Sequence, residues 1–200
     1  EIHTYSDTIQ AIVLRIIDIL VALGCRVHVG TATMPSLLYN EIVRRLGGSG
    51  KVYEVKLDKA TLESFDRHIV YKLSTGDDIF PTLDKMVAQG QKVLLVCNQV
   101  RRAQQLREQV AERYSDIPVM LIHSRFRRSD RGNLENRLTN DFNTRKGACI
   151  VVSTQVVEVS LDISFDAMIT ECAPIDALVQ RFGRVNRKRT PATIGHYKPV

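Results

Sequence analysis

The sequence predicts an α/β fold in which helices cover both faces of a parallel sheet. Residues 92–97 and 148–153 are short, almost unbroken apolar runs, which are typical of strands buried on both faces. Segments with helical periodicity separate these and other strand-like runs, and such alternation favours parallel pairing. With 200 residues, of which 44% are apolar, the chain can form one large domain or parts of two.

The first 58 residues predict two helices and two strands. Apolar residues recur at helical spacing across residues 9–20, Ser6 or Asp7 can serve as N-cap, and Gly24 can end this helix. Pro35 suits the first turn of a second helix. The expected order is helix 9–20, strand 26–30, helix 35–46 and strand 52–57.

Residues 67–200 predict a complete domain of alternating strands and helices, which follows a polar linker at residues 59–66. Strands are expected at residues 69–73, 92–97, 119–123, 148–153 and 167–172. Helices are expected at residues 79–89, 101–114, 127–142 and 175–186. Ligands of open α/β sheets bind at the carboxyl ends of the strands, so we expect a site at that edge.

The glycine-rich segment at residues 47–51 does not fit a phosphate-binding loop. That loop needs the pattern G-x-x-x-x-G-K-[ST], but Arg45 stands at the first glycine position and Val52 at the hydroxyl position. The segment also follows a predicted helix and precedes a predicted strand, which is the reverse of the required order. We therefore expect no phosphate loop in this chain.

The excess of basic over acidic residues lies in the second half of the chain. Residues 1–100 contain 11 basic and 11 acidic residues, whereas residues 101–200 contain 17 and 11, which accounts for the net charge of +6. This asymmetry favours contact with a polyanion. The four cysteines are widely spaced, which argues against disulfides and a zinc site and for a reducing, cytoplasmic setting. No apolar span of membrane length is present, so no membrane partner is expected.

The segment at residues 180–187, Gln-Arg-Phe-Gly-Arg-Val-Asn-Arg, is the strongest candidate for phosphate binding. Arginine stays charged and its planar donors match phosphoryl oxygens. If the segment is helical, Gln180, Arg184 and Arg187 are spaced i, i+4 and i+7 and share one face. The alternative is a solvated basic helix end.

The order of these motifs resembles superfamily 2 helicases, and most closely the helicase part of CRISPR-associated type I helicase-nucleases. The resemblance depends on residues 1–3 (Glu-Ile-His), 31–33 (Thr-Ala-Thr), 123–126 (His-Ser-Arg-Phe), 153–162 and 180–187. It implies a RecA-like fold, with residues 1–58 as the end of a first motor lobe and residues 67–200 as the second. It also implies that ATP binds between the lobes and that Mg²⁺ accompanies it.

The resemblance implies a catalytic role for Glu1, which would activate the attacking water, and for Gln180, which would orient the γ-phosphate. Arg184 and Arg187 would be arginine fingers that stabilise charge on the transferring phosphoryl group. His3 would bind near the nucleotide and couple its state to movement. The family's magnesium-binding Asp does not occur before Glu1 in this sequence.

The resemblance assigns the remaining sites to nucleotide, nucleic acid and coupling. Asp162 and Arg181 would lie near the nucleotide. Nucleic-acid contacts are expected from Arg125, Ser153 and Thr154. Thr31 and Thr33 would link nucleotide state to strand movement.

The implied activity is ATP-driven movement on single-stranded DNA, with the CRISPR RNA-guided surveillance complex as a possible partner. Because the sequence lacks a phosphate loop and starts at Glu1, we expect a piece of a longer protein that does not hydrolyse ATP by itself. Two alternatives stay open at this point: an RNA helicase or restriction-type translocase, and a nucleic-acid-binding module without catalysis.

Overall fold

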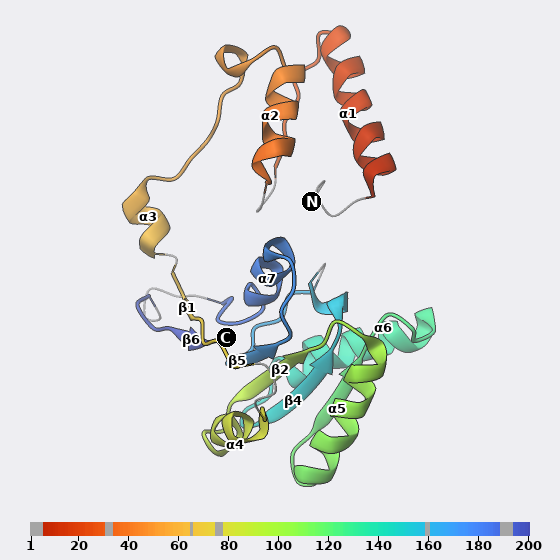
Figure 1. Cartoon of the computed structure of the whole chain (residues 1–200), viewed down its shortest axis with the longest axis vertical. Coiled ribbons are helices and arrows are strands. Elements are labelled where there is room, and N and C mark those ends of the chain that lie inside the picture. The colour runs from red at the N-terminus through yellow and green to blue at the C-terminus, as the bar shows by residue number, and fades with distance from the viewer. Residues whose placement is uncertain (1–5, 31–33, 65, 75–77, 159–160, 189–193) are drawn as a thin grey trace. The chain divides into compact units, whose positions relative to one another are not determined.

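The computed structural model describes residues 6–30, 34–64, 66–74, 78–158, 161–188 and 194–200. The chain divides into two compact units, Glu1–Asp58 and Lys59–Val200. Each unit is described by itself. Figure 1 gives the element labels used below.

The first unit contains the two predicted helices, α1 (Asp7–Ala22) and α2 (Ser36–Arg45), and a 3₁₀ turn, η2 (Ser49–Lys51). Gly24, which follows α1, has the positive φ of +71° that its predicted role at a helix end requires. Ile17 of α1 packs with Leu38 and Ile42 of α2 to form a small core. The two helices therefore bury one stripe each against the other.

The strands predicted at residues 26–30 and 52–57 are not formed. Both segments lack regular secondary structure. A strand needs a neighbouring strand for its backbone hydrogen bonds, and the described residues of this unit contain none. Tyr53 and Val55 would share one face of a strand, but they are 91% and 81% exposed. The apolar residues of these two segments were therefore insufficient to predict a strand.

The second unit begins with a short helix, α3 (Lys59–Ser64), inside the segment predicted as a linker. Its main sheet has four parallel strands in the order β3-β4-β2-β5. These are β2 (Lys92–Val96), β3 (Val119–Ile122), β4 (Cys149–Ser153) and β5 (Ala167–Thr170). A separate parallel pair joins β1 (His68–Ile69) to β6 (Lys198–Pro199). The predicted strand at residues 69–73 is thus reduced to its first residue.

Helices cover both faces of the four-stranded sheet, as predicted. These are α4 (Phe80–Ala88), α5 (Val100–Arg113), α6 (Arg128–Arg137) and α7 (Ile175–Phe182). On strand β2, Val93 and Leu95 pack in the core formed with α4 and α5. Leu94 and Val96 pack in the opposite core, beside α6 and the residues after α7. Burial on both faces explains why this strand is an unbroken apolar run.

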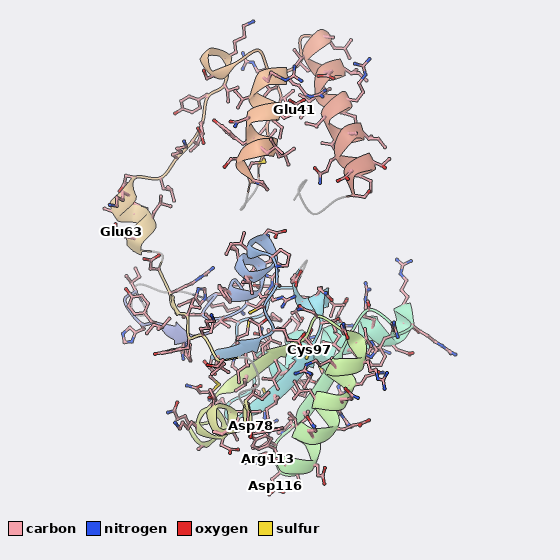
Figure 2. All side chains as sticks on the ribbon, in the orientation of Figure 1. Glu41, Glu63, Asp78, Cys97, Arg113 and Asp116 are labelled. Atoms are coloured by element: carbon pink, nitrogen blue, oxygen red, sulfur yellow. The ribbon has the colours of Figure 1, made fainter. Side chains whose placement is uncertain are left out.

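An ion pair joins α4 to the end of α5 that is remote from the carboxyl edge of the sheet. Arg113 pairs with Asp84 at 2.7 Å, and its guanidinium lies 5.1 Å from the centre of the Phe80 ring. In Figure 2, Arg113 and Asp116 lie at one end of α5, and Cys97, directly after β2, lies near the other. This division separates a structural end of the domain from the edge where the candidate site residues gather.

Two predicted helices differ from expectation in their last turns. The helix predicted for residues 127–142 is α helical only to Arg137 and continues as a π-helical turn, η3 (Leu138–Phe142). The turn buries Leu138 and Phe142 in the core. The helix predicted for residues 175–186 ends at Phe182, and this difference changes the geometry of the candidate site.

Candidate functional site at the carboxyl edge of the sheet

The carboxyl ends of the parallel strands form one edge, and polar residues follow each strand there. Asn98 lies beyond β2, His123 follows β3, Thr154 follows β4 and Glu171 follows β5. Gln155 donates to the backbone carbonyl of Asn98 at 3.1 Å, which links two of these strand ends directly. The predicted rim is therefore present within the second unit.

The motif at residues 180–187 does not form one helix, so the prediction of a shared helical face is wrong. Gly183 caps α7, and the backbone of Val185 then bridges Phe165. Asn186 adopts a left-handed φ of +51°, which a helix does not allow. Its side-chain amide donates to the backbone carbonyls of Arg67 and His196, and these contacts fix the turn. Arg184 and Arg187 consequently point to different surroundings.

Arg181 is buried, with 1% of its surface exposed, and its guanidinium joins four segments of its own domain. Its Nε donates to a carboxylate oxygen of Glu158 at 2.8 Å. The Nη1 group donates to the Thr170 hydroxyl and the Glu171 carbonyl, and Nη2 donates to the Asn98 side-chain oxygen. The structure therefore gives Arg181 a different role from the predicted nucleotide contact: it ties the ends of β2, β4 and β5 to α7.

Arg184 is also buried, and backbone carbonyls of the loop after β4 accept its hydrogen bonds. Its Nε donates to Val157 O at 2.7 Å, its Nη1 to Leu161 O at 2.9 Å, and its Nη2 to Glu158 O. A guanidinium with these three partners is occupied within its own domain. The predicted finger position is not matched by this geometry, and Arg184 would reach a phosphate only after it released this loop.

Arg187 is the arginine of the motif that stays accessible. Its side chain is 40% exposed and pairs with Asp162 at 3.1 Å, which brings together two predicted site residues. The Ser164 hydroxyl accepts the backbone N–H of Arg187 at 3.0 Å and so fixes where the side chain leaves the chain. Gln180, on α7, has a buried side-chain nitrogen with no hydrogen-bond partner among the described residues. Such an orphaned donor is costly unless a ligand accepts from it.

The predicted nucleic-acid contacts differ in accessibility. Ser153 and Thr154 are buried, and the Ser153 hydroxyl donates to the Thr154 carbonyl at 2.8 Å. Neither side chain is open to a phosphate in this structure. Arg125 is exposed in the turn after β3 and has no ion-pair partner within 4 Å among the described residues. Of the three, Arg125 is the residue that a nucleic-acid backbone can reach.

The remaining predicted site residues, Glu1, His3, Thr31 and Thr33, lie outside the described residues. Sequence analysis also missed residues that hold the strand ends or the motif at residues 180–187 in place. The sequence could have indicated Asn98 and Glu171, because each is a polar residue just beyond an apolar strand. Asn186 could not be found this way, since its role depends on a left-handed turn that local sequence does not specify.

His123 is a buried histidine at the same edge. It is 4% exposed, its ring stacks on Phe126 at 4.2 Å, and its Nδ1 has no hydrogen-bond partner among the described residues. Burial lowers the pKa of His123 from its usual 6.5, and the charge of Arg125 acts in the same direction. The folded domain therefore favours the neutral imidazole.

A folded-state pKa below 6.5 predicts that acid destabilises the second unit. The unfolded chain binds the proton more readily than the folded one. The contribution of His123 to the free energy of unfolding is therefore fully present above pH 6.5 and is lost as the pH drops towards the folded-state pKa. We expect urea midpoints, followed by circular dichroism, to decrease between pH 7.5 and pH 5.5. His123→Phe should reduce this decrease, whereas His196→Gln, a change at an exposed histidine, should leave it intact. An equal pH response in both variants would contradict the assignment.

Among the residues that the structure describes, no group of three or more His, Cys, Asp or Glu side chains could hold a metal ion. Over the same residues, none of the helices has both the length and the apolar character needed to cross a membrane.

A family model described as the C-terminal region of the CRISPR-associated nuclease/helicase Cas3 matches residues 89–190. The chain belongs to this Cas3 family. The matched region includes the whole four-stranded sheet and the motif at residues 180–187. The predicted resemblance to a superfamily 2 helicase of Cas3 type is thereby confirmed.

Curated relatives carry the same name. Cas3 of Streptococcus thermophilus is 26% identical over 94% of this chain and 23% of its own length. A putative Cas3 of Myxococcus xanthus is 33% identical over 95% of this chain and 25% of its own length. The Cas3 endonuclease/helicase of Escherichia coli is 40% identical over 52% of this chain. The chain thus spans about a quarter of the length of the first two relatives.

Solved structures support the RecA-like fold. A crystal structure of a CRISPR-associated protein aligns with a TM-score of 0.71 at 28% identity and covers 90% of this chain and 23% of its own. The structure of T. fusca Cas3 with AMPPNP aligns with a TM-score of 0.74 at 21% identity, over 100% of this chain and 28% of its own. At this lower identity the likeness shows the fold alone.

Proposed function

We propose that this chain is part of the ATP-driven motor of a Cas3-type helicase that moves along single-stranded DNA in CRISPR type I interference. The second unit would be the complete second motor lobe, and Glu1–Asp58 would be the end of the first. The observation that carries the proposal is the accessible Arg187–Asp162 pair beside α7, together with the orphaned nitrogen of Gln180. These groups fit a ligand that is rich in negatively charged oxygens.

The donors of Gln180 and Arg187 match the phosphate end of ATP. The Gln180 nitrogen would donate to a γ-phosphate oxygen, and Arg187 would exchange its carboxylate partner for the more highly charged phosphates. ATP supplies the transferable phosphoryl group, and Arg187 would stabilise the charge that develops on it. The Mg²⁺ expected from the resemblance would be held mainly by those phosphates, because the described residues contain no carboxylate cluster for a metal ion.

Contact with nucleic acid would involve the turn after β3. Arg125 is exposed there, and an arginine can hold a backbone phosphate without reading sequence. Thr154 and Ser153 lie beside the same edge but would need the loop after β4 to move before a phosphate could reach them. The surveillance complex remains a proposed partner of the intact protein.

Nucleic-acid-stimulated turnover tests this function. In the intact protein, we expect ATP hydrolysis to increase with single-stranded DNA and much less with RNA of equal length. The 200-residue chain by itself should hydrolyse no ATP, because its sequence contains no phosphate loop. Release of inorganic phosphate measures all three reactions.

Each outcome separates the rival functions. Stronger stimulation by RNA would favour an RNA helicase, and stimulation by double-stranded DNA alone would favour a restriction-type translocase. Binding of nucleic acid without any turnover by the intact protein would favour a module without catalysis. Turnover by the purified 200-residue chain would contradict the proposal that the chain needs the rest of the protein.

A further inference from the structure

The outermost strand β3 has one hydrogen-bonding edge that no other strand covers. The carbonyls of Pro118 and Ile122 accept from Ile150 and Thr154, at 3.0 Å and 3.4 Å, so these groups face β4. Successive backbone groups along a strand point to opposite sides, so the N–H and C=O groups of Val119 and Leu121 face away from β4. In the described part of the chain, no strand pairs with that side.

This strand edge opens into a groove of about 620 Å³. The helices α5 and α6 contribute its walls, and in Figure 1 both lie towards the β4 side of the sheet, away from β5. From α5, the residues Arg101, Gln104 and Glu108 line the groove at helical spacing. On the other side are Leu134 and Arg137 of α6. The groove therefore has a floor of strand backbone between two helices.

The groove is positively charged. Arg101, Arg107 and Arg137 line it, all three are exposed, and no carboxylate lies within 4 Å of their guanidinium groups among the described residues. The single acidic residue in the lining is Glu108. By contrast, Arg113 on the far turn of α5 is paired with a carboxylate. The three arginines of the groove thus lack the carboxylate partner that Arg113 has.

We propose that the groove binds an extended acidic segment of a partner polypeptide, which adds to the sheet as a fifth strand beside β3. Free N–H and C=O groups at strand spacing are complementary to another polypeptide backbone. Side chains of an added strand alternate in direction, so acidic residues can face Arg101 and Arg107 on one side and Arg137 on the other. The apolar side chains of Phe126 and Leu134 would contact apolar residues of the segment.

A polypeptide fits this groove better than a nucleic acid. A phosphate backbone can accept from the N–H groups of Val119 and Leu121 but has no donor for their C=O groups, and Glu108 would repel it. The groove also lies away from the motif at residues 180–187. It lies beside β3, at one side of the sheet. Phe165, which forms a bridge with Val185 of the motif, precedes β5 at the other side. This proposal therefore does not depend on ATP hydrolysis.

A labelled eight-residue peptide of sequence Glu-Glu-Val-Val-Glu-Glu-Val-Val, which as a strand presents Glu on both faces, tests the proposal by fluorescence anisotropy with the 200-residue chain. We expect it to bind, more weakly in 200 mM than in 50 mM NaCl because the charges are exposed. Replacing Glu by Lys in the peptide should abolish binding. Methylation of every backbone nitrogen of the peptide should also abolish it, since strand addition needs N–H groups along whichever peptide edge meets β3.

Variants of the protein localise the contact. The double change Arg107→Glu and Arg137→Glu should weaken peptide binding by about tenfold or more. The double change Arg145→Glu and Lys146→Glu, at two exposed basic residues outside the groove, alters the charge equally and is the matched control, which should have a much smaller effect. Circular dichroism checks that the variants fold. On binding, hydrogen exchange at the Val119 and Leu121 amides should slow.

Several results would overturn the proposal. These are absence of binding by the acidic peptide, equal binding by the methylated peptide, and unchanged exchange at Val119 and Leu121. Equal effects of the groove and control variants would show general electrostatic attraction instead of a site. Binding of a single-stranded oligonucleotide that is lost in the groove variant, with no binding of the peptide, would assign the groove to nucleic acid.

Discussion

Replacing Arg187 by Ala in the intact protein is expected to lower the ATP hydrolysis rate by about 10³-fold or more, the range seen when an arginine finger is removed. Arg187 is the arginine of the motif at residues 180–187 that the structure leaves accessible. Its loss should barely affect folding, because an exposed ion pair of this kind contributes about 0–1 kcal/mol. Its backbone hydrogen bond to Ser164 does not depend on the side chain.

The measurement is kcat for phosphate release at saturating single-stranded DNA, with DNA affinity and thermal unfolding measured beside it. Arg187→Lys keeps a charge but loses the planar fork, so it should recover only part of the rate. Arg113→Ala, at an arginine on the far turn of α5, should have normal kcat. A normal kcat in Arg187→Ala would refute the finger assignment.

Replacing Arg181 by Met is expected to cost about 3–5 kcal/mol of unfolding free energy, the usual effect of leaving a buried charge without its partner. Glu158, whose side chain is 14% exposed, would lose its counter-charge, and the polar ends of β2 and β5 would lose their shared donor. Urea unfolding of the 200-residue chain, followed by circular dichroism, measures the loss. The transition of the second unit should move to lower urea.

A double-mutant cycle separates the role of the pair from loss of packing. If the buried pair determines the effect, Arg181→Met combined with Glu158→Leu should be more stable than Arg181→Met alone, because both charges are then removed together. Arg113→Met is a useful comparison, since its ion pair is exposed and should contribute much less. Unchanged stability in Arg181→Met, with weaker nucleotide binding by the intact protein, would instead support the nucleotide contact predicted from sequence.

The motif at residues 180–187 shows where sequence reasoning was incomplete. Its resemblance to a helicase of Cas3 type was confirmed, whereas the phosphate binding predicted from its arginines stays a prediction. The assumption of a continuous helix was wrong because Gly183 caps α7 and Asn186 turns the chain. A four-residue difference in where a helix ends was enough to send Arg184 into the domain and Arg187 towards solvent.

By itself, the sequence determined the α/β fold, the strands of the main sheet and the edge where polar residues gather. These properties follow from local periodicity: a run such as residues 92–96 is apolar throughout because both of its faces are covered. Only the tertiary structure decided which arginines are buried, that residues 52–57 do not pair as a strand, and that β3 leaves one edge free. Hydrogen-bond partners distant in sequence decide each of these outcomes: the guanidinium of Arg184 binds carbonyls 23 to 27 residues away, and no pattern along the chain encodes that choice.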